Sequence, residues 1–509
     1  MTKVITQDSD PHEPTEGHGP QQKKKRQLIK RIFKCLGLGL LVVLIFAALI
    51  FQASWKVITP LLIILAACTI LPKWVRKWFW LSAAAVVIVL IIWVFMPDGD
   101  ADWRPYTFDE ELAALQAKYA VPDEENAALI YDKLFETMDG DPNEPEFFLQ
   151  SKPSSTNEPW LSKDHPETAE WLKGYQSTIE KLLQAAQKDK CRFPMRAEFV
   201  SYARHMEGLA KMRRCMFLLL SAANNDVAEG RTDAGLKKYL CITQIGHHLY
   251  QQQAILDCLM GFAIENLALT QLNRFVVERG PAKAQLELIG NSIRGLANNW
   301  SGDWRKMLDF EKLHTKNSIC SLFYEVNQKG KIRLSRGRLA VANEQYLQKI
   351  SPKTYCQRKL AKAKTILGWL YFPSTPKRVG QIVDTCFEKY YAMAEPNFDW
   401  DKPPSGSRPR RKINYRFLVE SLTDISGEVY HRVHEIYLRN LSLRRGSRLL
   451  VAIRQYQMEH NAWPPDLDAI RAAVPAEALI DPVTEKEFTY INHGERFSLY
   501  GETANIWPR

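Results

Sequence analysis

Apolar residues concentrate in one nearly charge-free block, Cys35–Met96, which breaks into three pieces. The first piece follows Lys34 and has 21 residues without a charge, and the last follows Lys77 and has 20. An α-helix of that length crosses a hydrocarbon core of about 30 Å. The middle piece, 57–72, has 16 residues, and its helix would reach about 24 Å. The pattern therefore predicts a membrane protein with two or three spans.

The charges around these pieces favour three spans. A cluster of seven basic residues at 23–34 precedes the first piece, three basic residues follow the middle one, and three aspartates follow the last. Spans at about 33–53, 57–72 and 78–96 keep both basic clusters in the cytoplasm and place the long C-terminal region outside. The alternative is that 57–72 re-enters without crossing, which would return the C-terminal region to the cytoplasm. A cleaved signal peptide is disfavoured because no A-x-A site follows the first piece.

The excess of basic over acidic residues is concentrated around the predicted spans and indicates membrane topology. The formal net charge is +11, but residues 1–97 hold 12 basic and 4 acidic residues, which leaves about +3 for the rest. We therefore expect the lipid bilayer as a partner, and no nucleic acid. The nine cysteines include no C-x-x-C pair, so neither a zinc ribbon nor a thioredoxin-type centre is expected. If the domain is exported, one or two disulfides could form, but spacing does not pair them.

Beyond the membrane block the pattern is helical, and strand-like alternation is nearly absent up to about residue 397. Apolar residues recur at helical spacing in six segments: 108–120, 121–138, 254–276, 282–297, 304–317 and 379–394. The predicted domain plan is a disordered basic cytoplasmic tail, a membrane domain, a helical soluble domain, a linker rich in Pro and Gly, and a long helix with a small α+β module. Their bounds are 1–30, 31–97, 98–397, 398–417 and 418–509.

The clearest helical unit is the pair 195–230 and 234–253. Gly230 is placed to end the first helix, and Thr232 or Asp233 is placed to cap the second helix. The small residues around this turn, A-x-x-x-x-x-A-E-G-R-x-D-x-x-L, are typical of tetratricopeptide-like hairpins, in which two antiparallel helices approach closely. No regular repeat runs through the body, so we expect an irregular helical stack.

The C-terminal part has a different pattern. A long helix runs from about Val429 to His460 and is stopped by Asn461–Pro465, and a short helix follows at 466–474. Alternation at 487–491 and 496–500 then predicts a β-hairpin.

The segments LLVAIRQYQMEHNAWPPDLDAI and VPAEALIDPVTEKEFTYINHGERFSLYG resemble the globular part of type II secretion major pseudopilins. Those proteins carry a helix, a proline stop, a D-P turn and a small hairpin. The matching residues are Tyr456, Pro464, Leu467, Asp481, Pro482, Tyr490 and Tyr500. Filament packing is not expected, since the helix carries Arg439, Arg444, Arg445, Arg448 and Arg454. Calcium binding is not expected either. The calcium-binding loop of those proteins needs several oxygen ligands, and the segment after the hairpin offers only Glu502, Thr503 and Asn505.

More of the chain is similar to a family of uncharacterised bacterial membrane-anchored proteins. The similarity runs from the P-x-x-E-N-A-A segment at 122–128 through the A-E-G-R-x-D hairpin to the pseudopilin-like tail. It implies a Gram-negative-type bacterial envelope and no established activity. Together with the three predicted spans, this leads us to expect a multi-pass protein of the bacterial inner membrane with a large periplasmic C-terminal domain.

Two histidine groups could carry chemistry. His431, His434 and Glu435, with Glu428, fall on one helical face and could bind a metal if another helix supplied a ligand; a solvated face is the simpler interpretation. The second group pairs His247 and His248 with Asp257 for acid–base work. Adjacent histidines point about 100° apart on a helix, so one packed and one exposed histidine is the simpler interpretation.

Two further features leave these interpretations unchanged. His205 and Glu207 in the preceding helix do not complete the His247–His248 group. The basic run Arg408, Arg410, Arg411 and Lys412 could hold an anionic lipid or a phosphate-bearing partner, but a solvated loop explains it as well. We therefore assign no catalytic, cofactor-binding or metal-ligating residue from the sequence, and no cofactor.

The predicted function is that of a membrane-anchored envelope protein, a non-catalytic scaffold that binds proteins or peptides and is linked to secretion or pilus-type machinery. No G-x-S-x-G, phosphate-loop, G-x-G-x-x-G or H-E-x-x-H motif is present. The alternative is an envelope hydrolase or metal-dependent enzyme with a site assembled from dispersed histidines and acids. It requires a deep pocket lined by such residues, with a common acid approached by two of His205, His247, His248, His314, His431 and His434.

Overall fold

The computed structural model describes most of the chain after residue 102. The described ranges are 103–137, 145–146, 154–194, 199–296, 299–334, 375–395, 398–400, 423, 427–502 and 504–508. The predicted tail, the three predicted spans, most of the predicted linker and the basic run at 408–412 lie outside these ranges. All described residues belong to one compact unit, Gly99–Pro409 with Tyr415–Arg509.

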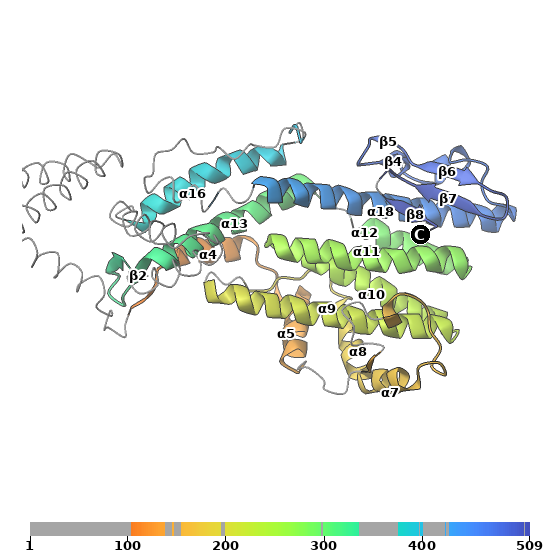
Figure 1. Cartoon of the computed structure of the whole chain (residues 1–509), viewed down its shortest axis with the longest axis horizontal. Helices are drawn as coiled ribbons and strands as arrows, with labels where there is room; N and C mark the ends of the chain where they lie inside the picture. Colours follow the sequence, from red (N-terminus) through yellow and green to blue (C-terminus); the bar gives the residue numbers. More distant parts are fainter. Residues whose placement is uncertain are drawn as a thin grey trace, which may run out of the picture. The chain divides into compact units, whose positions relative to one another are not determined.

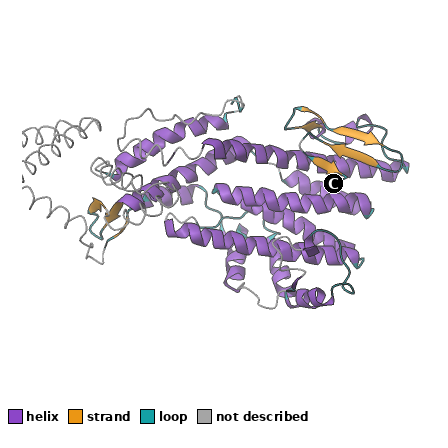
Figure 2. Ribbon diagram, in the orientation of Figure 1, coloured by secondary structure: helices purple, strands orange, loops and turns teal. Residues whose placement is uncertain are grey.

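This unit is mainly helical with small antiparallel sheets, which confirms the predicted α class (Figures 1 and 2). Its centre is a layer of long helices: α9 (Phe199–Ala228), α10 (Thr232–Tyr250), α11 (Ile255–Glu278) and α18 (Gly427–His460). Helix α10 packs against α9 and α11, and α11 packs against α18. The other helices are α4 (Asp109–Lys118), α5 (Ala128–Thr137), α7 (Pro166–Gly174), α8 (Gln176–Ala185), α12 (Lys283–Gly295), α13 (Trp300–Phe323) and α16 (Pro376–Tyr391).

Glycines allow the central helices to approach closely. A Cβ added at Gly235 on α10 would lie 2.5 Å from Cγ2 of Val227 on α9, and one at Gly261 on α11 would lie 2.6 Å from the Gly246 carbonyl oxygen on α10. Backbones this close leave no room for a side chain, and the predicted close approach of α9 and α10 is therefore present. Gly230 has φ +80° at the turn between them, a conformation that glycine adopts at no steric cost.

The predicted cap of α10 is wrong. Helix α10 begins at Thr232, and its N-cap is Arg231, whose side chain makes no capping hydrogen bond. Asp233 instead accepts a hydrogen bond of 2.6 Å from Gln285 on α12. The positive end of the helix dipole stabilises a carboxylate in the first turn even when that carboxylate makes no capping hydrogen bond. Asp233 can therefore use its carboxylate for a contact with another helix.

Two apolar cores lie along α18. Leu449 and Ile453 belong to the larger core, with residues of α9, α10 and α11, while Tyr430 and Val433 belong to a second core built around Trp304 of α13. The second core is rich in aromatic rings; Tyr430 and Tyr390 of α16 meet edge to face with centroids 4.6 Å apart. Helix α18 thus belongs to both cores.

A small sheet interrupts the helical region, contrary to the expectation that strands are nearly absent there. Strand β2 (Tyr324–Val326) pairs antiparallel with β1 (Arg104–Pro105) and β3 (Ile332–Leu334). Strands of two or three residues are too short to produce a readable alternation. The partner of β1 also lies more than 200 residues away in sequence, so no local turn pattern signals the pairing.

The C-terminal hairpin is present where alternation predicted it. Strand β6 (Thr489–Asn492) pairs antiparallel with β7 (Phe497–Tyr500), and Gly494 has φ +87° in the turn. A further strand, β8 (Asn505–Trp507), pairs with β7 and was not predicted. The predicted short helix is the 3₁₀ turn η5 (Asp468–Ala473), followed by η6 (Ala476–Leu479) and the paired strands β4 (Ile480–Asp481) and β5 (Lys486–Glu487).

This module packs directly on α18. Ile506 of β8 lies so close to Gly446 that a Cβ there would be 2.5 Å from it. Arg445 on α18 donates a hydrogen bond of 2.9 Å to the carbonyl oxygen of Ile480.

Among the described residues one helix, α11, is long and apolar enough to cross a membrane, and 61% of its apolar window is buried inside the protein. A core helix of a folded domain has the same composition, and α11 packs against α9, α10 and α18.

Candidate functional site

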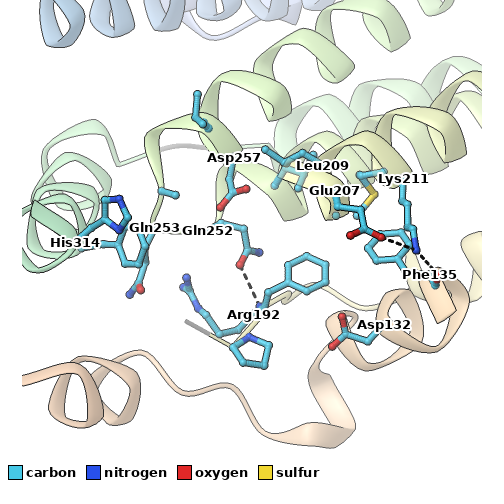
Figure 3. A pocket seen from close by; sticks show the side chains of 18 of the residues that line it. Asp132, Phe135, Arg192, Glu207, Leu209, Lys211, Gln252, Gln253, Asp257 and His314 are labelled. Carbon is cyan, nitrogen blue, oxygen red and sulfur yellow. Dashed lines mark hydrogen bonds and ion pairs between the residues drawn. The ribbon is translucent and has the colours of Figure 1, made fainter. Parts of the chain in front are cut away.

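A pocket of about 510 Å³ opens between α5, α9, the α10–α11 turn and α13 (Figure 3). Its wall combines apolar side chains with charged ones. The apolar set includes Phe135, Phe193, Leu209, Met212, Leu249, Leu256 and Phe310. The charged set is Asp132, Glu136, Arg192, Glu207, Lys211, Asp257 and Glu311.

The turn between α10 and α11 supplies the most unusual side chain of this wall. Gln253 is 3% exposed, and neither its Nε2 nor its Oε1 has a hydrogen-bond partner among the described residues. A buried amide without a partner costs about 1–3 kcal/mol of stability. The sequence placed Gln253 at the end of a helix, but α10 ends at Tyr250, and Gln253 lies in the turn that lines the pocket.

Arg192 faces the same part of the pocket, as Figure 3 shows. Its buried Nε has no hydrogen-bond partner among the described residues. Burial lowers the pKa of Arg192. Burial also lowers the pKa of Lys306 on α13 to about 8, and the Arg192 charge lowers it further. The Lys306 ammonium donates a hydrogen bond of 2.6 Å to the Gln251 carbonyl oxygen and is not part of the pocket wall, so Arg192 is the cation on the wall beside the buried Gln253 amide.

The backbone that carries Arg192 is held firmly in place. Asn126 accepts a hydrogen bond of 2.8 Å from the Arg192 N–H and donates one of 3.0 Å to its carbonyl oxygen. The Gln252 side chain holds the residues on either side of Arg192. It accepts a hydrogen bond of 3.2 Å from the Phe193 N–H and donates one of 2.8 Å to the Cys191 carbonyl oxygen. The Arg192 segment is thus positioned before any ligand binds.

The other part of the pocket is acidic and apolar. Lys211 on α9 donates a hydrogen bond of 2.9 Å to the Phe135 carbonyl oxygen and forms an ion pair of 3.3 Å with Glu207. Asp132 of α5 lies on this side in Figure 3, and Glu136, one helical turn further along α5, also lines the pocket. Since Glu207 and Lys211 neutralise each other, acids outnumber bases in the remaining wall.

The structure gives His247 and His248 different roles. His248 is fully buried, with Nδ1 2.9 Å from the Tyr131 hydroxyl and Nε2 2.7 Å from the Lys188 carbonyl oxygen. His247 is half-buried rather than exposed and stacks on Tyr250. Burial lowers the pKa of each imidazole to about 4. The prediction that one packs is confirmed, whereas the predicted exposure of the other is wrong, because Tyr250 covers its ring.

The histidines on this face of α18 both contact Trp400. The His434 ring stacks on Trp400 with centroids 3.5 Å apart, while His431 Nε2 lies 3.0 Å from the Trp400 carbonyl oxygen and Nδ1 lies 3.5 Å from Glu435. The Glu428 and His205 side chains lie outside the described part. Across the residues that the structure describes, no group of three or more His, Cys, Asp or Glu side chains could hold a metal ion.

The pocket does bring together three residues that the sequence named separately: His314, Asp257 and Glu207. No sequence pattern pointed to Gln253 or Arg192. Each lies close to the end of a predicted helix, where a side chain can contribute to a site without disturbing a helical face, and this position is the signal that could have drawn attention to them.

No protein-family model, no curated protein and no solved structure matches this chain.

Proposed function

We propose that this chain is a membrane-anchored, non-catalytic binding protein whose helical domain takes a peptide segment of a partner into the pocket between α5, α9 and the α10–α11 turn. The observation that carries the proposal is the buried Gln253 amide, which lines the pocket with both polar atoms unpartnered among the described residues. An amide offers one donor group and one acceptor, which is what a peptide backbone requires. The stability lost by burying it is explained if a ligand supplies its partners.

The enzyme alternative has less support. The described wall of the pocket contains one histidine, His314, and not the pair that an acid–base site of dispersed histidines requires. His247 and His248 are committed to packing, as described above. The function therefore rests on recognition rather than on a reaction.

The sequence supplies the remaining parts of this proposal. The three charge-free pieces and their basic flanks support three spans with the helical domain in the periplasm of a bacterial envelope. The small-residue hairpin supports a tetratricopeptide-like stack, an architecture suited to peptides. The resemblance of 449–501 to the globular part of major pseudopilins supports a link to secretion or pilus-type machinery, by analogy of fold alone.

A pocket-blocking variant tests the binding function. Gly208 lines the pocket on α9, and a Cβ added there has no atom within 4 Å, so Gly208→Phe fills the pocket without straining the helix. The control is Gly174→Phe, because Gly174 on α7 has equally open space and lies outside the pocket. The full-length protein, held in lipid nanodiscs, is exposed to a synthetic pool of random short peptides, and the retained peptides are identified by mass spectrometry.

We expect the wild type and Gly174→Phe to retain the same peptides and Gly208→Phe to lose them. Retention of the same peptides by Gly208→Phe, or retention of none by the wild type, would refute the proposal.

A further inference from the structure

The Gln253 end of the pocket has the features of an anion site. Arg192 brings a positive charge to it, and the Arg192 Nε is buried without a partner among the described residues. Burying a charged N–H group without a hydrogen-bond partner is costly, because that group loses its hydration. An anionic ligand that accepts from Nε would remove most of that cost, and charge-assisted hydrogen bonds of this kind are about twice as strong as neutral ones.

The hydrogen-bonding groups of Gln253 favour a peptide carboxylate over a phosphate as the bound anion. Its amide nitrogen can donate to the anion, but its Oε1 accepts hydrogen bonds and needs a donor. A phosphate dianion carries acceptors and would leave that oxygen unpaired. The last residue of a peptide carries a carboxylate and, one Cα atom away, a backbone N–H. It can therefore satisfy Arg192, the Gln253 nitrogen and the Gln253 oxygen together.

The rest of the pocket wall indicates which side chains the peptide ligand carries at and before its C-terminal residue. Leu209, Met212 and Leu249 present apolar surface, which suits an apolar side chain at the end of the ligand. Beyond them lie Asp132 and Glu136 of α5, where a cation would be favoured.

We propose, building on the binding function above, that the pocket recognises the free C-terminal end of a peptide. Its carboxylate binds Arg192 and the Gln253 amide nitrogen, and its last backbone N–H donates to Gln253 Oε1. An apolar final side chain packs on the wall, and a basic side chain upstream lies near Asp132 and Glu136.

The test uses the same full-length protein with two forms of the random peptide pool, one with free C-terminal carboxylates and one with C-terminal amides. We expect free-acid peptides to be enriched about tenfold or more over their amides, the loss expected when a hydrogen-bonded charge is removed. The retained peptides should end in apolar residues and carry Lys or Arg upstream. Arg192→Gln should abolish the preference for the free acid.

A second variant separates recognition from folding. Gln253→Leu removes both unpartnered atoms at nearly constant volume, so binding of the free acid should fall about tenfold or more, while the urea midpoint of unfolding stays equal or rises. The matched control is Ser447→Ala on α18, where a 1% exposed hydroxyl without a described partner lies outside the pocket. That variant should keep full binding.

The outcomes distinguish this proposal from the binding function on which it rests. Equal retention of acids and amides by the wild type, lost in Gly208→Phe, would overturn the carboxylate assignment and leave the peptide-binding function standing. The carboxylate assignment is likewise overturned if Gln253→Leu binds the free acid as tightly as the wild type does. If no peptide of either form depends on the pocket, both proposals fail.

Discussion

Arg444 on α18 and Glu265 on α11 form a buried, bidentate ion pair: Nε and one terminal nitrogen of the guanidinium group donate to the two carboxylate oxygens. Arg444 is 4% exposed and Glu265 is fully buried. The remaining guanidinium nitrogen donates at 2.5 Å to the carbonyl oxygen of Leu296, just after α12. The pair thus fixes the long C-terminal helix to the central helix of the domain.

Breaking this pair on one side should be far more damaging than removing both charges. Arg444→Met leaves the Glu265 carboxylate buried and uncompensated, so we expect the free energy of unfolding to fall by about 3–5 kcal/mol. In the double variant Arg444→Met with Glu265→Leu the loss should be much smaller, since no charge remains to desolvate. Urea unfolding followed by tryptophan fluorescence measures both. A double variant at least as unstable as the single one would show that the pair does not act as a unit.

The crossing of α10 and α11 depends on the absence of side chains at Gly246 and Gly261. Gly261→Ala places a methyl group 2.6 Å from the Gly246 carbonyl oxygen and 2.8 Å from the Tyr250 nitrogen. Both are backbone atoms that cannot rotate away, so the helices must separate, and overpacking of this kind costs about 1–3 kcal/mol. Because Tyr250 leads into the turn that carries Gln253, peptide binding should weaken as well.

Gly174→Ala on α7 is the control for that substitution, since nothing lies within 4 Å of its added Cβ. There alanine should be neutral or stabilise by about 0.5–1 kcal/mol, its usual advantage over glycine in a helix. Equal stability changes at the two glycines, measured by urea unfolding, would contradict the close helix crossing.

The helices could be predicted because their apolar period extends over many residues. The pattern placed helices at 254–276 and 429–460, and the structure has α11 at Ile255–Glu278 and α18 at Gly427–His460. Periodicity reports which face is buried, but not which partner covers it. The arginines of α18 were therefore expected to prevent filament packing, and nothing in the pattern indicated that Arg444 pairs with Glu265, 179 positions earlier.

The pocket could not be predicted either, because periodicity does not show which helices pack against one another. Asp257, His314 and Glu207 were each named, yet their meeting depends on the packing of α9, α11 and α13. Gln253 and Arg192 lie in turns, where there is no period to interpret. A buried amide without a partner is a property of three-dimensional packing, and the sequence carries no local sign of it.

Acid should destabilise the domain through its buried imidazoles. The pKa of His248 falls from an ordinary 6.5 to about 4, because burial disfavours the charged form and the hydrogen bond to Lys188 offsets this only in part. Above pH 6.5 both folded and unfolded chains hold a neutral His248, so it costs no stability. As the pH falls from about 6.5 to about 4, the unfolded chain binds a proton that the folded chain does not, and stability drops by about 1.4 kcal/mol per pH unit.

His248→Gln should make this pH dependence shallower, since the amide cannot titrate. The matched control is His493→Gln, the same substitution at an exposed position of the C-terminal hairpin. Urea midpoints compared at pH 7 and pH 5 give the two slopes. An unchanged slope in His248→Gln would show that this imidazole is not held neutral by the fold.

Under the proposed membrane anchoring, the side of the membrane that holds the helical domain determines where the proposed peptide ligands come from. Three spans predict a periplasmic domain, so alkaline phosphatase fused at residue 102 or after residue 509 should be active, and a fluorescent protein at the same points should be dark. The buried free thiols of Cys191 and Cys241 are compatible with that oxidising compartment, because burial raises the pKa of each and keeps the reactive thiolate scarce. Fluorescence at both points would mean that 57–72 does not cross. The pocket would then face cytoplasmic peptides, and the link to secretion machinery would be withdrawn, while the contacts of Arg192 and Gln253 would still define the same ligand chemistry.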